Sequence, residues 1–316
     1  MKVVFNKRYN PRKNNLFINK ENKIFIRKFG FFYKVIKILY IQINKLLFKR
    51  KSQQILNILK NLEKKIFFLE KKIEYSNNDL TLDKNILKNA MSKNYEVITD
   101  FPVALQSPDH LHPTGTAVDN TRSPFFVTVI NNFFSKKIDY LDLGCAGGGL
   151  CYDFLSKGNH SIGLEGSDYS KVLGRAFWPI LPNNLYTADI TKEFKIINNN
   201  DQAKFDLITA FEFLEHIKEN DLQTLFTNVQ KHLKPDGYFI GSIGTDVSFS
   251  PDGYSLHQTV WSVETWCEYL AKYFDLCEDI SFEFSQFPRG VGNTYEDPNF
   301  FLSDIGFHFQ CKNKKK

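Results

Sequence analysis

The sequence predicts an α/β domain with a largely parallel sheet and helices on both faces, preceded by a basic helical extension. After residue 100, short apolar runs alternate with helical stretches, as expected for strands connected by helices. The charge also changes along the chain: Met1 to Ile98 contain 23 Lys and Arg against 7 Asp and Glu, and the remainder contains 18 against 28. We therefore expect a cationic extension and an acidic domain with different partners.

We divide the extension into three parts: a basic, low-complexity arm at 1–52, a short coiled coil at 53–76, and a linker or docking helix at 77–100. The arm suits contact with an anionic membrane surface, or it is a poorly ordered leader. The coiled coil either joins two copies of the chain in a homodimer or packs against the main domain. It is predicted from a spacing of alternately four and three residues between Ile55, Leu59, Leu62, Ile66, Leu69 and Ile73.

Cysteine and charge patterns bear on the cellular setting. The chain has five cysteines, an odd number without a CxxC pair, which argues against a disulfide framework or a zinc knuckle. We expect a reducing, cytoplasmic setting, peripheral to a membrane if the arm binds one. The most apolar stretch, 24–48, contains five basic residues, so neither a membrane span nor a signal peptide is expected.

The domain at 101–312 is expected to contain five core strands, at 138–143, 161–164, 184–188, 205–210 and 238–243. A helix is predicted at 221–233, because the sequence Lys234-Pro-Asp-Gly237 that follows is a strong stop signal. Two later apolar runs, 276–284 and 304–311, predict a closing pair of strands.

The most informative segment is Tyr140-Leu-Asp-Leu-Gly-Cys-Ala-Gly-Gly-Gly149, a strand followed by a glycine loop and a helix. Glycines allow the backbone to approach a ligand at the carboxyl end of a strand. The loop alone is also a degenerate match to the dinucleotide-binding signature. Asp142, however, would repel a pyrophosphate, whereas it can hold an ammonium group directly or through water. The loop is therefore predicted to bind a zwitterionic amino-acid tail.

Two further acidic residues follow the next strands. Glu165 ends the second strand, where a carboxylate can accept hydrogen bonds from both hydroxyls of a ribose. Asp189 and Ile190 follow the third strand, where they can contact an adenine amino group and ring. Singly, each acid is equally well explained as a cap of the following helix.

From about Asp139 to Gly244 the sequence resembles class I S-adenosylmethionine-dependent methyltransferases, because LDLGCAGGG, GLEGSD, ADIT, KFDLITAFEFLEHI and HLKPDGYFIGS occur in the order and spacing of that family. The resemblance implies a Rossmann-like seven-stranded sheet and S-adenosyl-L-methionine as cofactor. One departure is Ala146, which replaces the middle glycine of the usual GxGxG and narrows the cleft by one methyl group. The residues implied in cofactor binding are Asp142, Gly144, Cys145, Ala146 and Gly148 at the first strand and loop, and Glu165, Asp189, Ile190 and Phe211 at the next strands.

Three residues are candidates for a general base when the methyl acceptor is a hydroxyl: Glu212, His216 and His257. If 211–217 turns helically, Glu212, Glu215 and His216 share one face, and His257 would complete a set of four ligands for a divalent cation. That set is similar to the one in metal-dependent O-methyltransferases of small-RNA 3′ ends and of ubiquinone biosynthesis. The alternative without a metal is favoured, because Leu-Glu-His-Ile is widespread in metal-free members.

Acceptor recognition is expected from polar segments outside this core, namely 107–116 with Asp119 and Asn120, and the loop 285–302. The block from Ser161 to Thr191 resembles methyltransferases that accompany glycan assembly, which predicts a small-molecule or glycan hydroxyl as acceptor. The alternative is a metal-assisted RNA 2′-O-methyltransferase, disfavoured because the catalytic part is acidic and would repel phosphates. A third possibility is a scaffold protein that binds the cofactor without turnover.

Overall fold

A computed structural model of the chain describes Lys88 and the residues 93–113, 117, 119–281 and 306–314. The arm, the coiled coil, most of the linker and the loop at 285–302 lie outside the described residues, as do Thr114, Gly115 and Thr116 of the first acceptor segment. The predictions made for these segments stay predictions.

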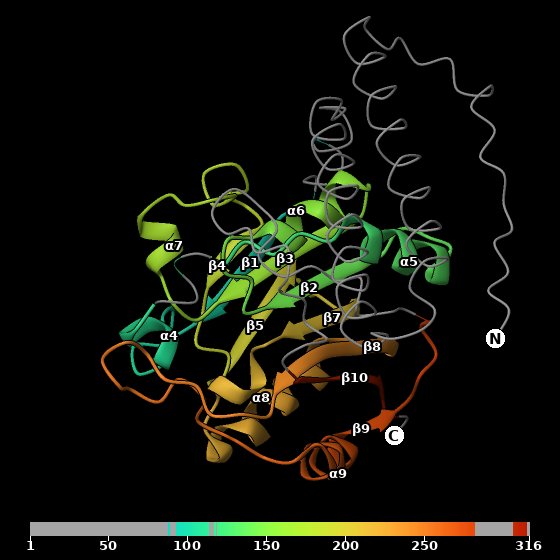
Figure 1. Cartoon of the computed structure of the whole chain (residues 1–316). Coiled ribbons are helices and arrows are strands. Elements are labelled where there is room, and N and C mark those ends of the chain that lie inside the picture. The colour runs from blue at the N-terminus through green and yellow to red at the C-terminus, as the bar shows by residue number, and fades with distance from the viewer. Residues whose placement is uncertain (1–87, 89–92, 114–116, 118, 282–305, 315–316) are drawn as a thin grey trace, which may run out of the picture. The chain divides into compact units, whose positions relative to one another are not determined.

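A seven-stranded mixed sheet forms the centre of the domain (Figure 1), which confirms the predicted fold class. Neighbouring strands run parallel from β4 to β8, whereas β10 is antiparallel to both β8 and β9. In their order across the sheet the strands are β4 (Leu185–Thr187), β3 (His160–Glu165), β2 (Asp139–Leu143), β7 (Phe205–Phe211), β8 (Leu233–Gly244), β10 (Gly306–Asn313) and β9 (Phe274–Leu276).

Helices cover both faces of the sheet, because successive side chains of a buried strand point in opposite directions. Leu141 belongs to a core cluster with apolar residues of α8 and α9, whereas the neighbouring Tyr140 belongs to a second cluster with residues of α5 and α6. Its ring stacks on that of Phe154, with centroids 3.7 Å apart. The helices of these two layers, on opposite sides of the sheet in Figure 1, are α5 (Pro124–Phe134) and α6 (Gly149–Ser156), and α8 (Glu219–His232) and α9 (Val263–Tyr273).

A second, three-stranded sheet contains β1 (Tyr95–Thr99), β5 (Phe194–Asn198) and β6 (Asp201–Gln202). The predicted linker or docking helix at 77–100 therefore ends in a strand. Tyr95, Val97 and Thr99 are β-formers on alternate positions, and Tyr95 is buried. Their antiparallel partner β5 lies almost one hundred residues further along the chain, so the pairing has no local sequence signal.

The predicted strand at 276–284 is wrong for the described residues 277–281, because β9 ends at Leu276. Beyond it, the side chain of Gln310 replaces a strand partner. The Ile280 N–H donates to Gln310 Oε1 at 3.1 Å, and Gln310 Nε2 donates to the Ile280 carbonyl oxygen at 2.7 Å. These two bonds satisfy the backbone of Ile280 without a ladder.

Ion pairs close the amino-terminal edge of the sheet. Lys234 Nζ lies 2.9 Å from Asp139 Oδ2 and 2.7 Å from Asp206 Oδ2, and Lys93 also pairs with Asp139. Burial favours the neutral acid, but hydrogen bonds from Lys93 and Lys234 outweigh burial and lower the pKa of Asp139 to about 2. This edge is therefore structural, and the opposite, carboxyl edge is available for ligands.

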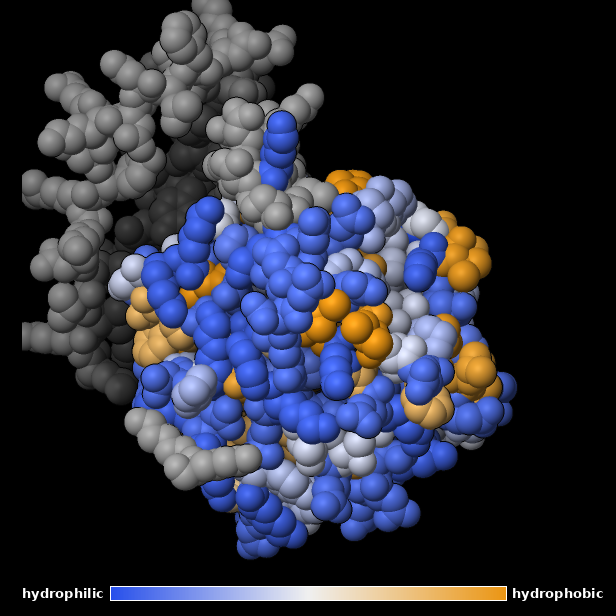
Figure 2. Space-filling view, turned by 180° about the vertical axis from the view of Figure 1, so that it is seen from behind, coloured by the Kyte–Doolittle hydropathy of each residue, from blue (hydrophilic) through white to orange (hydrophobic). Residues whose placement is uncertain are grey.

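The face seen in Figure 2 is largely hydrophilic, with scattered hydrophobic side chains between polar ones. Within the described residues, no helix has the length and apolar character needed to cross a bilayer.

Candidate functional site

The carboxyl ends of β2, β3 and β4 bring the predicted acidic residues to one edge of the sheet. Asp142 is in β2, Glu165 is the last residue of β3, and Asp189 follows β4 by two residues. The glycine loop between β2 and α6 contains left-handed residues at Gly144 (φ 74°), Ala146 (φ 43°) and Gly148 (φ 82°). Ala146 thus adopts a conformation that glycine tolerates more easily, so the departure from the usual motif falls at a strained position.

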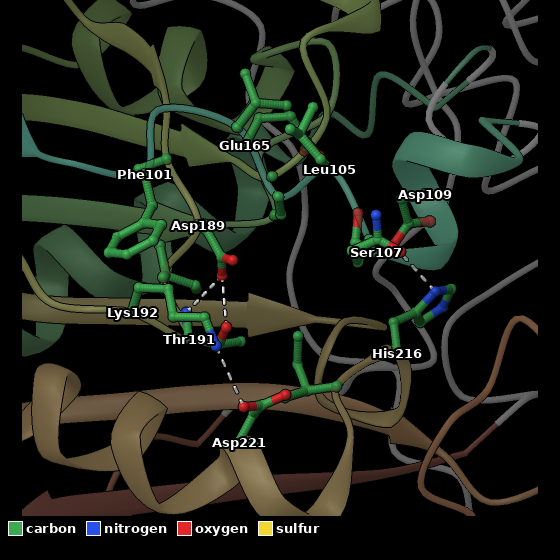
Figure 3. A pocket seen from close by; sticks show the side chains of 18 of the residues that line it. Phe101, Leu105, Ser107, Asp109, Glu165, Asp189, Thr191, Lys192, His216 and Asp221 are labelled. Carbon is green, nitrogen blue, oxygen red and sulfur yellow. Dashed lines mark hydrogen bonds and ion pairs between the residues drawn. The ribbon is translucent and has the colours of Figure 1, made fainter.

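A cavity of about 360 Å³ lies beside Glu165 and Asp189 (Figure 3), within the size range of small-molecule sites. Gly144 and Ile190 also line it. Its other side is formed by the segment 101–109, which ends in the short helix α4 (Pro108–Leu111). Backbone hydrogen bonds hold this segment in place: Asp189 N–H donates to the Phe101 carbonyl oxygen and Ala104 N–H to that of Gly166, both at 2.9 Å.

Sequence reasoning missed the contribution of residues 101–106 to the cavity. Phe101 and Leu105 line it although they are 46% and 59% exposed. The apolar run Phe101-Pro-Val-Ala-Leu105, between Asp100 and Gln106, is the local signal that could have found them.

Glu165 is tied to the glycine loop. Its two carboxylate oxygens accept hydrogen bonds from the backbone N–H groups of Ala146 (2.8 Å) and Ser167 (3.1 Å). Burial and the nearby charge of Asp109 outweigh these bonds and raise the pKa of Glu165 to about 7. Each oxygen still has a second lone pair, so the side chain can also accept from a ligand.

Asp189 has a local structural role as well. Its Oδ1 accepts hydrogen bonds from the backbone N–H and the hydroxyl group of Thr191, at 3.0 and 2.5 Å. This is the turn-capping role that an isolated acid after a strand often has. Because the side chain also lines the cavity (Figure 3), capping orients it toward the space beside Ile190.

A second cavity, of about 30 Å³, continues from Gly144 on the other side of the loop. It is lined by four of the predicted cofactor residues in addition to Gly144, namely Asp142, Cys145, Ala146 and Phe211, and by Asp119, Thr121 and Leu150. Burial raises the pKa of Asp142 to about 7, although the nearby hydroxyl groups of Thr209 and Tyr140 lower it. A positive ligand group here would stabilise the ionised carboxylate.

Gly148 lines neither of these two cavities. It is the N-cap of α6, and a Cβ atom there would lie 2.5 Å from Leu185 Cδ1. Glycine is therefore required at position 148 for the loop to pack against β4.

The segment after β7 differs from the predicted helical turn. Only Leu214–His216 form a 3₁₀ helix (η1), and Glu212 has a left-handed φ of 49°. Glu212 consequently does not share a face with the other three candidate ligands. Glu215, His216 and His257 do come together, with one ligand atom of each within 4.8 Å of the others.

The predicted acceptor segment contacts three parts of the carboxyl edge. Asp109 lies 3.2 Å from His216 Nδ1 (Figure 3), and His110 lies 3.6 Å from Asp168. His112 lies 3.2 Å from Asp252, and its ring stacks on Tyr254 in the loop after β8. Asn120 is buried against the glycine loop, where it faces Gly147 and Gly149.

Comparison with known proteins identifies the family to which the chain belongs. A family model described as a methyltransferase domain matches residues 121–281, about half of the chain. No curated protein sequence matches the chain.

Several solved structures are similar at low sequence identity. A Pyrococcus horikoshii OT3 protein is 19% identical, with 59% of this chain and 87% of that chain covered and a TM-score of 0.38. The Burkholderia thailandensis 1,6-didemethyltoxoflavin-N1-methyltransferase with bound S-adenosylhomocysteine is 12% identical, covering 60% and 76%, with a TM-score of 0.41. A glycopeptide N-methyltransferase, also complexed with S-adenosylhomocysteine, is 15% identical, covering 60% and 89%, with a TM-score of 0.41.

Proposed function

Since the chain belongs to a family of methyltransferase domains, we propose that it transfers the methyl group of S-adenosyl-L-methionine to a hydroxyl group of a small molecule or glycan. The observation that carries the proposal is the placement of Asp142, Glu165 and Asp189 at adjacent strand ends, around two cavities that share Gly144. Three carboxylates in a row match a ligand with an ammonium group, a diol and an aromatic amine.

The described residues fit this cofactor. The larger cavity offers Glu165 to the ribose hydroxyls, and Asp189 with the apolar wall of Ala188 and Ile190 to the adenine. The smaller cavity offers Asp142 to the amino-acid end. A dinucleotide fits less well, because two acids, Asp119 and Asp142, line the space next to the glycine loop and would repel a pyrophosphate.

The bound cofactor would supply a methyl group on a positively charged sulfur. The protein then has to hold the acceptor in line and take up its proton, and positioning alone is worth about 7 to 11 kcal/mol in such displacements. His257 is our first candidate for the base. Its Nδ1 lies 2.6 Å from the carbonyl oxygen of Asp246, which can only accept a hydrogen bond, so in the neutral ring Nε2 carries the lone pair.

His216 and Glu212 are the further candidates. His216 lines the larger cavity, and its ring packs edge-to-face on that of His257 with centroids 5.1 Å apart, so the two imidazoles lie on the same side of the site. Glu212 lies directly beyond Phe211, which lines the smaller cavity. A base of this kind contributes about 10²- to 10⁴-fold when the nucleophile is a hydroxyl.

The charges around these residues favour an uncharged acceptor. Asp109 lies beside His216, and Asp168 and Asp252 lie beside His110 and His112 of the acceptor segment. A phosphate-rich chain such as RNA would meet this negative charge. A polyol suits the arrangement, because carboxylates and imidazoles accept and donate hydrogen bonds to hydroxyl groups.

Cofactor binding is the first test. Calorimetric titration of the full chain with S-adenosylhomocysteine should show one site, and Asp142→Ala and Glu165→Ala should each abolish measurable binding. Glu268→Ala, on the exposed side of α9, is the matched control and should bind as the wild type does. Unchanged binding in both site variants, or binding of a nicotinamide dinucleotide instead, would contradict the proposal.

The acceptor is tested separately. Incubation with a radiolabelled methyl donor and separate glycan, small-molecule, lipid, RNA and protein fractions should label the glycan or small-molecule fraction. Label in RNA alone would replace our proposal by the RNA alternative. Cofactor binding with no labelled product in any fraction would favour a scaffold without turnover.

A further inference from the structure

Glu215, His216 and His257 form a cluster on the acceptor side of the site. Two of them belong to η1, and His257 comes from the loop after β8, so the fold brings together residues about forty positions apart. One ligand atom from each lies within 4.8 Å of the others. Two imidazoles and one carboxylate are a common ligand set for divalent transition metals.

Glu215 has one carboxylate oxygen without a partner. The residue is fully buried, and its Oε1 accepts a hydrogen bond from the Gly244 N–H at 2.9 Å. Its Oε2 is buried and has no hydrogen-bond partner among the described residues. The backbone N–H groups of Gln258 and Thr259 approach the same residue, but they donate to its main-chain oxygen. A buried, unsatisfied carboxylate oxygen costs free energy, and a cation beside it would remove that cost.

The two histidines are oriented by outer partners. His257 Nδ1 donates to the carbonyl oxygen of Asp246, which directs the lone pair of the neutral ring to Nε2. His216 Nδ1 lies 3.2 Å from the carboxylate of Asp109. In metal sites the second ring nitrogen of a ligating histidine is usually held by such a carboxylate or carbonyl group.

The backbone of Gly244 lies between Glu215 and His257, where there is no room for a side chain. A Cβ atom on Gly244 would lie 2.9 Å from His257 Cε1 and 3.0 Å from Glu215 Oε1. The absence of a side chain at Gly244 thus lets the carboxylate and the imidazole approach each other across the end of β8.

We propose that Glu215, His216 and His257 bind a divalent first-row transition metal such as Zn²⁺, Mn²⁺ or Co²⁺. Two imidazoles favour these ions over Mg²⁺ and Ca²⁺, which prefer oxygen ligands throughout. Glu212 is outside the set, because it precedes η1 with a left-handed backbone. Three protein ligands leave coordination positions open. If the proposed function holds, an acceptor hydroxyl could occupy one of them and lose its proton more easily. His257 would then be a ligand and no longer the free base, because the ion uses its Nε2 lone pair.

The test uses Co²⁺ as the probe. Full-length protein, treated with EDTA and dialysed, is titrated with Co²⁺ while its visible absorption and the heat of binding are recorded. We expect one Co²⁺ per chain with ligand-field absorption bands, displaced by Zn²⁺. Glu215→Gln keeps the hydrogen bond from Gly244, and both this variant and His257→Ala should weaken binding by at least about 100-fold. Asp109→Asn, which alters only an outer partner, should weaken it by about 10-fold.

Two controls make the result specific. Glu212→Gln and His160→Gln should bind Co²⁺ as the wild type does, because Glu212 is outside the set and His160 lies at the opposite edge of the sheet, beside Asp139. Failure of the wild type to bind one Co²⁺, or equal binding by Glu215→Gln and His257→Ala, would overturn the inference. S-adenosylhomocysteine binding in EDTA reports the proposed function independently, so either idea can fail alone.

Discussion

The hydroxyl group of Thr209 donates a hydrogen bond of 2.7 Å to the carboxylate of Asp142, its register partner across β2 and β7. The Thr209 oxygen also lies 2.6 Å from the hydroxyl group of Tyr140. Because Thr209 has one hydrogen and gives it to Asp142, Tyr140 must donate to Thr209. The three buried side chains form a directed chain that holds Asp142 at the glycine loop.

Loss of this donor should weaken cofactor binding. Thr209→Val is nearly isosteric, but removes one hydrogen bond to a carboxylate, so the pKa of Asp142 should rise further above its present value of about 7. We expect the affinity for S-adenosylhomocysteine at pH 7 to fall about 10-fold. Calorimetry at pH 6.5 and 8.5 should show a smaller loss at the higher pH. Thr227→Val on α8 should bind normally, and an equal loss at both pH values would contradict this account.

The raised pKa of Asp142 predicts a pH-dependent stability. The pKa of Asp142 is about 7 in the folded protein and near 3.8 when unfolded, so the folded state holds the proton more tightly. Its contribution to stability is complete below the unfolded pKa and is lost as the pH rises through 7. Asp142→Asn cannot ionise, so from pH 5 to pH 8.5 the variant should gain about 2 kcal/mol relative to the wild type. Urea unfolding at the two pH values measures this difference, and a constant difference would argue against it.

Lys234 should contribute to stability through the amino-terminal edge. Lys234→Met leaves Asp139 and Asp206 without a shared cation, and we expect a loss of about 1 to 3 kcal/mol at pH 7. Since the pKa of Asp139 is lowered, this contribution is present above its unfolded pKa and disappears as the pH falls through about 2. The difference from wild type should therefore shrink between pH 7 and pH 3. Lys231→Met, which removes only an exposed pair with Glu193, should change stability by less than about 0.5 kcal/mol.

A substitution at Gly148 distinguishes a role in loop packing from a role in cofactor contact. Gly148→Ala places a methyl group 2.5 Å from Leu185 at a φ of 82°, so we expect the melting temperature to fall by several degrees. Bound S-adenosylhomocysteine should stabilise the variant and the wild type by similar amounts, because the position lines neither cavity. A normal melting temperature with lost ligand stabilisation would instead assign Gly148 to cofactor contact.

The parallel core could be predicted from sequence because its strands are short, largely apolar segments between turn signals. Four of the six positions from Phe205 to Ala210 are apolar and all six are buried, so β7 needs no information from elsewhere in the chain. The acids at strand ends were equally visible, since a strand end and an acidic residue are both local features. Their gathering at one edge then followed from parallel topology.

The features that could not be predicted from sequence depend on contacts between distant residues or on the local backbone conformation. β1 exists because β5 pairs with it, and the strand expected after Leu276 fails because the Gln310 side chain takes the place of a strand partner. The left-handed turn at Glu212 separates it from Glu215, although a helical projection places the two together. The pattern of residue types along the sequence does not indicate these contacts or this backbone conformation.

Asp109 faces two ways: it lines the larger cavity, and its carboxylate contacts His216. Any occupant of the cavity that shifts Asp109 therefore also changes the orientation of that imidazole. Binding free energies are reciprocal. If an ion at His216 raises or lowers the affinity of the cavity for its occupant by some factor, the occupant changes the affinity for the ion by the same factor. Through Asp109, the short helix α4 thus makes binding in the larger cavity and ion binding at His216 either cooperative or antagonistic, but not independent.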